Sequence, residues 1–133
     1  MGDYLDKPSD PFNEYEPVDS SAAAIASQGL LRLGSYLKNS GDEEDGLSYW
    51  QAGLKVMDTL LEEPYLSTGK EHQGLLLHTI YHHPNGWDHI HEGSKIPYGE
   101  SCMWGDYHIR EACLYLDRII NNGKYYTYYN CVK

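Results

Sequence analysis

The residues best suited to chemistry gather between His82 and His108. Five of the seven histidines lie in this segment, together with Trp87, Trp104 and several carboxylates. Imidazoles can donate or accept hydrogen bonds and titrate near neutral pH, and indole rings can stack on the apolar face of a sugar. The segment is too rich in glycine and proline for a regular helix, and its aromatic content argues against disorder. We therefore predict an ordered loop that carries the function.

Six residues of this loop are candidate contacts for a bound saccharide. Trp87 and Trp104 could stack on a sugar ring or fill the end of the helical domain. Lys95 is the best candidate to meet a sugar carboxylate or sulfate, because the backbone amides of Gly93-Ser94-Lys95 can assist it. The other candidates are polar side chains that could bind hydroxyl groups or line the rim of a pocket. The full set is Trp87, His89, Lys95, Glu100, Ser101 and Trp104.

Other kinds of site find less support in the sequence. A helical zinc pair needs a His-Glu-x-x-His spacing with a third ligand in reach, and the sequence has no such motif, so we expect no metal site. Ser20 and Ser21 are not expected to be nucleophiles, because no Gly-x-Ser-x-Gly turn surrounds them. Asp19 and Asp106 are expected to be helix N-caps, since a carboxylate in that position accepts hydrogen bonds from free backbone amides.

Two helices are predicted before the loop. Residues 1–18 contain three prolines among acidic residues and are predicted to form an extended lead-in. Apolar residues at helical spacing predict a first helix over about 20–38, and its two internal glycines suggest close approach by a neighbour. The acidic stretch 39–46 is expected to be a solvated linker to a second helix, which packs antiparallel to the first and ends at Pro64. The apolar stripe expected on this second helix is Leu47, Trp50, Leu54, Met57 and Leu61.

One helix is predicted after the loop. It is expected to begin at Gly105 or Asp106 and to end at Asn121-Asn122-Gly123. For residues 74–81, a short apolar run, periodicity does not decide between a helical turn and an extended segment. The three helices predicted from spacing indicate an all-α fold, and the conformation of the tyrosine-rich tail 125–129 is left open. A length of 133 residues corresponds to one domain.

Composition and charge exclude several classes of function. The formal charge of −10 argues against nucleic acid as a partner, because phosphate binding relies on clusters of lysine and arginine. The first residues have neither the basic nor the apolar region of a signal peptide, and no apolar run could span a bilayer, so we expect a cytoplasmic protein without a membrane partner. Three cysteines without a Cys-x-x-Cys spacing do not suggest a disulfide framework or a zinc ribbon.

Three blocks of the sequence resemble the C-terminal part of one enzyme family. In type and in order they are similar to the unsaturated glucuronyl hydrolases, glycoside hydrolase family 88, over approximately residues 10–120. The Asp-Ser-Ser-Ala block is the specific part of this resemblance, whereas Gly-Asp-Tyr alone would be weak. The blocks are Asp19-Ser20-Ser21-Ala22-Ala23-Ala24-Ile25-Ala26 followed by Gly29-Leu30-Leu31, then Gly74-Leu75-Leu76-Leu77-His78, and finally Gly105-Asp106-Tyr107 with Glu111-Ala112.

The resemblance implies both a fold and an activity. Enzymes of this family are (α/α)6 barrels of six helical hairpins, and they remove unsaturated glucuronic acid from the non-reducing end of oligosaccharides made by polysaccharide lyases. An aspartate acts as general acid and base to hydrate the C4=C5 double bond of the sugar. The hemiketal that results then opens and releases the glycosidic bond. The resemblance implies no metal or organic cofactor.

The chain departs from the family pattern on its N-terminal side. The catalytic aspartates of the family precede the Asp-Ser-Ser-Ala block, and that half of the barrel is missing here. Twelve helices with their loops need on the order of 300 residues. Residues 1–133 are therefore expected to form a single partial domain, the C-terminal third of a barrel, whose expected partners are an unsaturated uronic acid oligosaccharide and the missing N-terminal half. We expect no catalytic residue in the chain and no hydrolase activity from the chain alone.

Two alternatives remain open. The chain could be a stand-alone carbohydrate-binding or helical interaction module without catalysis, and saccharide binding combined with cooperative unfolding of the purified chain would favour this reading. It could also come from an unsaturated rhamnogalacturonyl hydrolase, which shares the barrel and acts on a different lyase product. The Asp-Ser-Ser-Ala block favours the glucuronyl enzymes.

Overall fold

The computed structural model describes residue 4 and residues 6–69 and 71–124 of the chain. Within this part the chain is helical, and apart from one isolated bridge it contains no β-structure, which confirms the prediction of an all-α fold. The tyrosine-rich stretch 125–129 and Cys131 lie outside the described residues. The helices are α1 (Ser20–Asn39), α2 (Glu43–Leu60), the short 3₁₀ turn η1 (His83–Asn85) and α3 (Met103–Ile120).

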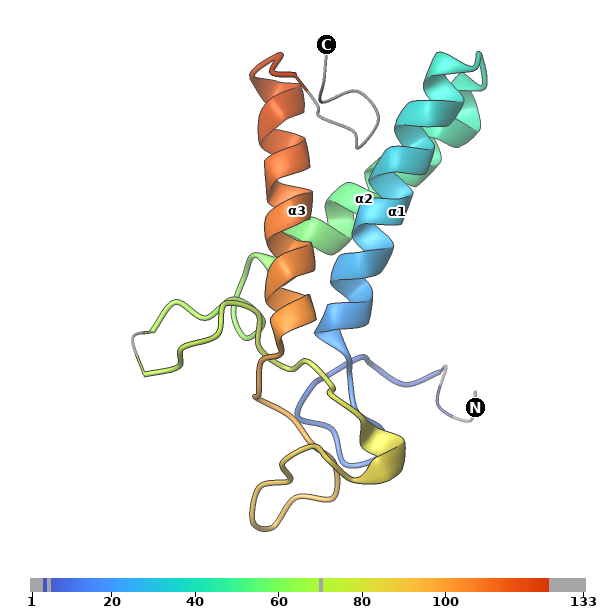
Figure 1. The fold of residues 1–133 in the computed structure, drawn as a ribbon. Helices are drawn as coiled ribbons and strands as arrows, with labels where there is room; N and C mark the ends of the chain where they lie inside the picture. The colour runs from blue at the N-terminus through green and yellow to red at the C-terminus, as the bar shows by residue number, and fades with distance from the viewer. Residues whose placement is uncertain (1–3, 5, 70, 125–133) are drawn as a thin grey trace.

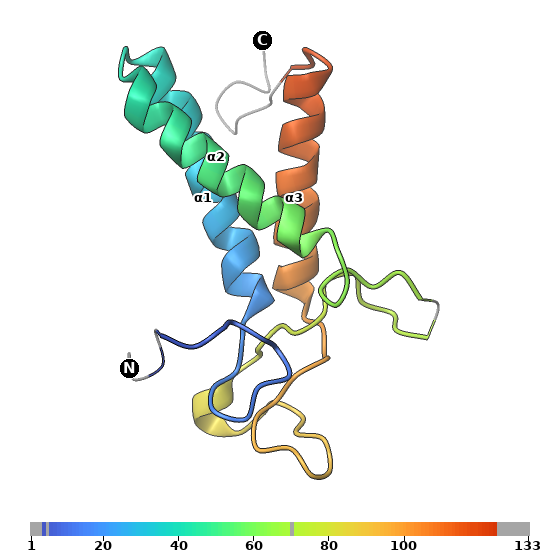
Figure 2. The same ribbon diagram turned by 180° about the vertical axis from the view of Figure 1, so that it is seen from behind.

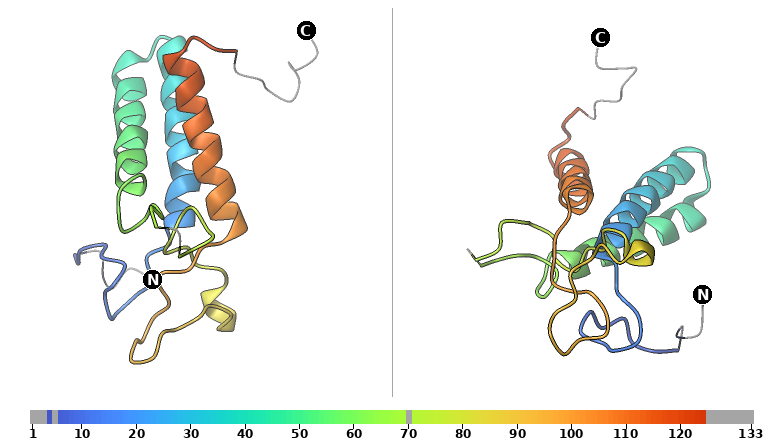
Figure 3. Two further views of the ribbon diagram at one scale, coloured as in Figure 1. Left: turned by 90° about the vertical axis from the view of Figure 1, so that its left-hand side faces the viewer. Right: turned by 60° about the horizontal axis from the view of Figure 1, so that its bottom comes forward.

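The three α-helices form a hairpin with a third helix beside it. α1 and α2 are antiparallel, as predicted, while α3 lies against α1 and runs in the same direction (Figures 1 and 2). Near the starts of α1 and α3, Trp104 forms a hydrogen bond with Ser21, and further along Tyr115 forms one with Ser35. Beyond this second pair the two helices diverge. The lead-in and the long α2–α3 connection gather at the end where α1 and α3 begin (Figure 3). This end therefore collects the segments that carry most of the candidate site residues.

α1 forms over nearly the predicted residues, with small side chains on its buried face. Asp19 is its N-cap and accepts a hydrogen bond from the backbone N–H of Ser21, as expected. A Cβ atom added at Gly34 would lie 2.6 Å from the backbone nitrogen of Trp50. One added at Gly29, which is exposed, would meet no atom within 4 Å. The predicted close approach is confirmed at Gly34 and wrong at Gly29.

α2 begins earlier than the sequence suggested. The prediction of a solvated linker over 39–46 is wrong, because Asp42 is the N-cap and Glu43, Glu44 and Asp45 form the first turn of the helix. The physical reason is electrostatic. Carboxylates in the first turn lie at the positive end of the helix dipole and stabilise the start of the helix.

The buried face of α2 is rotated relative to the predicted stripe. A Cβ atom added at Gly53 would lie 2.8 Å from the side chain of Leu31, so α1 approaches α2 along its glycines. The apolar periodicity missed this face because it does not register glycine. Three leucines of the predicted stripe are exposed, namely Leu47, Leu54 and Leu61. Met57 is buried as predicted, and the other buried residues of the helix are Gly46, Gly53 and Leu60.

α3 also begins earlier than predicted. Its N-cap is Cys102, which makes no capping hydrogen bond through its side chain, and Asp106 already lies in the first turn. The prediction that Gly105 or Asp106 starts the helix is therefore wrong, and the long loop ends at residue 102. The predicted end is confirmed, because Asn122 has a φ of 52° and leaves the helical conformation.

Residues 74–81, whose conformation the sequence left open, form an extended segment at the centre of the loop end. Leu66 and Leu76 form an antiparallel bridge, and the backbone N–H of Leu77 donates to the carbonyl of Tyr65 at 2.7 Å. The backbone N–H of Ser20 donates to the carbonyl of His78 at 3.1 Å, which ties the segment to the start of α1. The lead-in, predicted to be extended, contains short turns and packs against this segment through Phe12.

The core lies where the helices meet the extended segment. Leu31, Met57, Leu76 and Ile109 are its largest fully buried apolar side chains. Apolar side chains on the outer faces of the helices remain exposed, among them Ile25, Leu33, Leu47, Leu54, Leu61, Leu114 and Ile120. These exposed side chains leave apolar surface uncovered on all three helices. As a separate matter, none of the described helices combines the length and the apolar character needed to span a bilayer.

Candidate functional site

Asp19 connects three parts of the loop end. Its Oδ1 accepts hydrogen bonds from the backbone N–H of Ser21 at 3.0 Å, from the Ser21 hydroxyl at 2.6 Å and from the backbone N–H of Ile80 at 3.2 Å. The indole N–H of Trp104 donates to the same Ser21 hydroxyl at 3.2 Å. The expected N-cap of α1 therefore also fixes the extended segment and the first turn of α3.

Asp106 is not the N-cap that the sequence suggested. Its carboxylate reaches out of α3 and accepts hydrogen bonds from the backbone N–H groups of Leu75, at 3.0 and 3.1 Å, and Leu76, at 2.8 Å. Gly105 allows the close approach that this requires, since a Cβ atom there would lie 2.7 Å from the Thr79 side chain. The Gly-Asp pair thus docks α3 onto the extended segment.

Four rings form a continuous surface at the loop end, which we call the aromatic strip: Trp104, Tyr81, Trp87 and His82. Tyr81 stacks on Trp104, with ring centroids 5.1 Å apart and an angle of 24° between the ring planes. The ring centroids of Tyr81 and Trp87 are 5.9 Å apart, and those of Trp87 and His82 are 4.9 Å apart. Tyr81 is 53% exposed and Trp87 is 61% exposed. Rings held in this way are available to a ligand.

The strip brings together two of the six predicted site residues, Trp87 and Trp104, and adds two that were not among the candidates, Tyr81 and His82. Trp87 and Trp104 come from different elements and meet through Tyr81. Tyr81 was not a candidate because it stands at the end of the apolar run 74–81, where a core role is the simpler reading. Its exposure and its stack on Trp104 depend on a contact between residues far apart in the sequence.

The other predicted site residues lie apart from the strip or serve the fold. The ammonium of Lys95 is 3.0 Å from the Glu14 carboxylate of the lead-in, an exposed ion pair. His89 packs edge-on against His91, with centroids 4.8 Å apart. Ser101 packs so closely against Gly74 that a Cβ atom at residue 74 would lie within 2.2 Å of the Ser101 side chain.

Glu100 contributes to the fold mainly through its backbone. Its carbonyl accepts a hydrogen bond from the backbone N–H of Thr79 at 2.9 Å, and its carboxylate lies 3.8 Å from His72.

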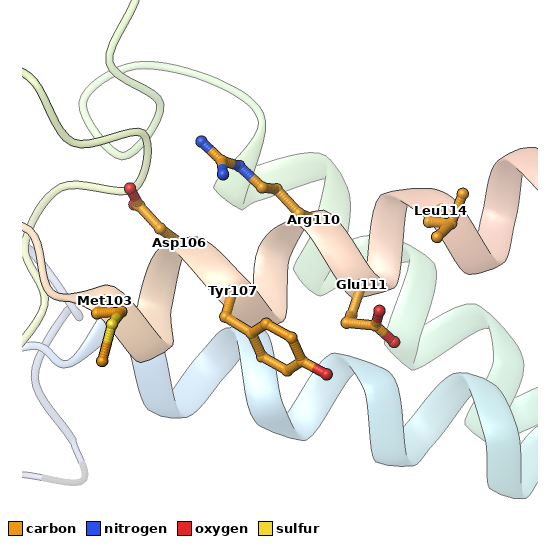
Figure 4. A pocket seen from close by; sticks show the side chains of 6 residues that line it. All are labelled: Met103, Asp106, Tyr107, Arg110, Glu111 and Leu114. Carbon is orange, nitrogen blue, oxygen red and sulfur yellow. The ribbon is translucent and has the colours of Figure 1, made fainter. Parts of the chain in front are cut away.

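A separate open hollow lies on the outer face of α3, where Tyr107 and Glu111 point to one side and Asp106 and Arg110 to the other (Figure 4). No residue of the strip lines this hollow.

His78 is a buried histidine that joins the lead-in to the loop. Its φ of 62° is left-handed, and its Nδ1 accepts a hydrogen bond from the backbone N–H of Gly99 at 3.1 Å. The rings of Phe12, Tyr65 and Tyr98 surround it. Burial lowers the pKa of His78, and this effect outweighs the opposing influence of the Pro64 carbonyl and the Asp10 carboxylate. The neutral imidazole is therefore the form that fits the fold.

Acidification is expected to destabilise the chain through His78. Because the pKa of His78 is lowered on folding, the unfolded chain binds the proton more readily, and stability falls as the pH drops below about 6.5, the ordinary value for histidine. The measurement is the free energy of unfolding in urea at several pH values between 5 and 8.

The control for this prediction is the variant His78→Asn. Asparagine tolerates a left-handed backbone and does not titrate in this range. Its free energy of unfolding should change less between pH 7.5 and 5.5 than that of the original chain. Equal changes in the two proteins would show that other groups cause the pH dependence.

Among the described residues, no group of three or more histidine, cysteine, aspartate or glutamate side chains is placed to hold a metal ion.

Comparisons with known proteins assign the chain to no family. No protein-family model, no curated protein and no solved structure matches the chain. The geometry of the loop end and the sequence blocks that resemble the glucuronyl hydrolases are therefore the features that bear on function.

Proposed function

We propose that the aromatic strip binds a saccharide, and that the chain is part of a hydrolase that removes unsaturated glucuronic acid from lyase-generated oligosaccharides. The observation that carries this proposal is the row of Trp104, Tyr81 and Trp87 at the loop end, contributed by two elements, in which Tyr81 and Trp87 are exposed and Trp104 is half-buried. One face of a sugar ring presents C–H groups, which suit the negative face of an aromatic ring. The phenol and indole edges add hydrogen-bonding groups for sugar hydroxyls.

The arrangement of the helices supports a place in an (α/α)6 barrel. In a barrel of hairpins, the inner helices of successive hairpins run parallel, and an outer helix connects them. α1 and α3 run parallel, and α2 returns between them along the chain. The uncovered apolar side chains on all three helices would be buried by further hairpins. In this proposal the strip lies at the mouth of the barrel.

The role proposed for this chain is binding rather than proton transfer. Asp19 and Asp106 are the two aspartates within the sequence blocks that resemble the family, and both already accept several hydrogen bonds that hold the fold together. Neither is therefore proposed as the acid that hydrates the double bond. That aspartate would come from helices outside the 133 residues.

Saccharide binding is tested by removing rings of the strip. Trp87→Ala and Tyr81→Ala are each expected to weaken binding of an unsaturated glucuronyl disaccharide at least about tenfold, which corresponds to roughly 1.4 kcal/mol. Affinity can be measured by isothermal titration calorimetry. The absorbance of the conjugated double bond should stay constant during the titration, since we propose no turnover by the chain alone.

The matched control for these variants is Trp50→Phe. Trp50 packs against Tyr115 between the helices, away from the strip, so this variant should keep the affinity of the original chain. Affinity that is unchanged in both strip variants, or no affinity in the original chain, would contradict the proposal.

A stand-alone carbohydrate-binding module is the second candidate function. It is favoured by the internal consistency of the described residues, in which every buried polar side-chain atom has a hydrogen-bond partner. The two candidates differ in their unfolding. A module that is complete in itself should keep the same unfolding midpoint with or without further hairpins, whereas the midpoint of a part of a barrel should rise when its uncovered helices are paired.

A further inference from the structure

Residues 81–88 form a loop that a single carboxylate closes. The backbone N–H of Tyr81 donates to Asp88 Oδ1, and the backbone N–H of His82 donates to Asp88 Oδ2 at 2.9 Å. Within the loop, the N–H of Asn85 donates to the carbonyl of His82 at 3.1 Å, and Gly86 turns the chain with a φ of 64°. We call residues 81–88 the clasp.

The clasp determines where Trp87 lies. Trp87 directly precedes Asp88, so a carboxylate that binds the amides at residues 81 and 82 also fixes the backbone beside the Trp87 ring. That ring packs on Tyr81 and His82, at the start of the same loop. These ring contacts, the two Asp88 hydrogen bonds and a long hydrogen bond from the backbone N–H of Trp87 to the carbonyl of His82, at 3.5 Å, join the two arms of the clasp.

The two halves of the aromatic strip are held by different carboxylates. Asp19 fixes the half formed by Tyr81 and Trp104, through the N–H of Ile80 and the Ser21 hydroxyl. Asp88 fixes the half formed by Trp87. Asp88 is far less involved in the helical fold than Asp19, because both backbone N–H groups that donate to its carboxylate belong to the clasp.

We propose that Asp88 is a positioning residue that aligns Trp87 with Tyr81 and Trp104, so that one saccharide can contact both halves of the strip. This inference rests on the proposed function, because it assigns a role within the same surface. Asp88 acts on the ligand through Trp87 and does not need to touch it. The expected consequence is that Asp88 matters to binding only while the Trp87 ring is present.

A double-mutant cycle between Asp88 and Trp87 tests this role. Asp88→Ala should weaken binding of an unsaturated glucuronyl disaccharide about tenfold and leave the midpoint of thermal unfolding close to that of the original chain. Adding Asp88→Ala to Trp87→Ala should cause little further loss, because the two residues act as one unit. Asp58→Ala, an exposed aspartate of α2, is the matched control and should change neither property.

A second measurement keeps the test independent of ligand binding. The near-ultraviolet circular dichroism of the stacked rings should decrease in Asp88→Ala, and Asp88→Asn, which keeps one acceptor oxygen, should lie between the two. Asp88→Asn also serves in the cycle if Asp88→Ala does not fold. Additive losses in affinity, or an unchanged ring spectrum, would overturn the role of Asp88. Absence of binding by the original chain would instead refute the proposed function and leave the spectrum to decide the role of Asp88.

Discussion

Replacing Gly34 with alanine is expected to destabilise the chain by about 2 kcal/mol, because the added methyl group has no room between α1 and α2. The Cβ atom would lie 2.6 Å from the backbone nitrogen of Trp50 and 2.8 Å from the carbonyl oxygen of Gly46. Both atoms belong to the backbone of α2, so the helix must move as a whole to relieve the clash. The estimate includes the gain of up to about 1 kcal/mol that alanine brings to a helix interior. Urea unfolding measures the change.

The matched control is the same substitution five residues earlier in α1, at Gly29. Gly29 is exposed, and a Cβ atom there would meet nothing within 4 Å. Gly29→Ala should therefore stabilise the chain by up to about 1 kcal/mol through helix propensity alone. Effects of the same sign at the two positions would contradict the close packing of α1 against α2 at Gly34.

Replacing Asp106 with alanine is expected to cost about 3 kcal/mol of unfolding free energy. The substitution leaves the backbone N–H groups of Leu75 and Leu76 without their acceptor, in a part of the core where Leu76 is fully buried. Hydrogen bonds to a charged group contribute roughly 1.5–3 kcal/mol, and an unpaired buried donor adds a desolvation cost. Chemical denaturation measures this loss.

Two further variants separate the proposed role of Asp106 from a simple effect of charge. Asp106→Asn retains one acceptor oxygen and should lose less than half as much stability as Asp106→Ala. Asp58→Ala removes an exposed charge from α2 and should stay within about 0.5 kcal/mol of the original chain. A small effect of Asp106→Ala, similar to that of Asp58→Ala, would mean that the extended segment does not depend on this carboxylate.

The helices could be predicted from the sequence because their signals are local. Capping residues and spacing within one or two turns are enough to predict the N-cap at Asp19 and the end of α3 near Asn122. The same local signals predict the antiparallel hairpin. The linker at 39–46 was misassigned because a cluster of acids fits both a solvated loop and the first turn of a helix. The buried face of α2 could not be predicted from apolar spacing, because glycine residues lie on that face and have no side chain to contribute to the pattern.

The candidate site was predictable only in part, because its geometry depends on contacts between distant residues. Trp87 and Trp104 were recognised from their residue type, but their alignment depends on Tyr81, which no local signal marks. Asp106 appeared to be a cap because a carboxylate near a helix start usually is one. Its actual partners are 30 and 31 residues away in the sequence.

The glycine contact between α1 and α2 makes the two interfaces of α1 unequal in stiffness. Where two backbones touch, neither helix can slide or rotate without a clash, so the hairpin behaves as a fixed frame. α3 meets the same frame tightly only where it begins, because Trp104 donates to the Ser21 hydroxyl and a Cβ atom at Gly105 would lie 3.3 Å from the Ser21 side chain. Further along, the contacts include the ion pair between Arg32 and Glu111, whose long side chains can change rotamer, so small movements of α3 would pivot about its first turn and leave the Trp104 ring in place.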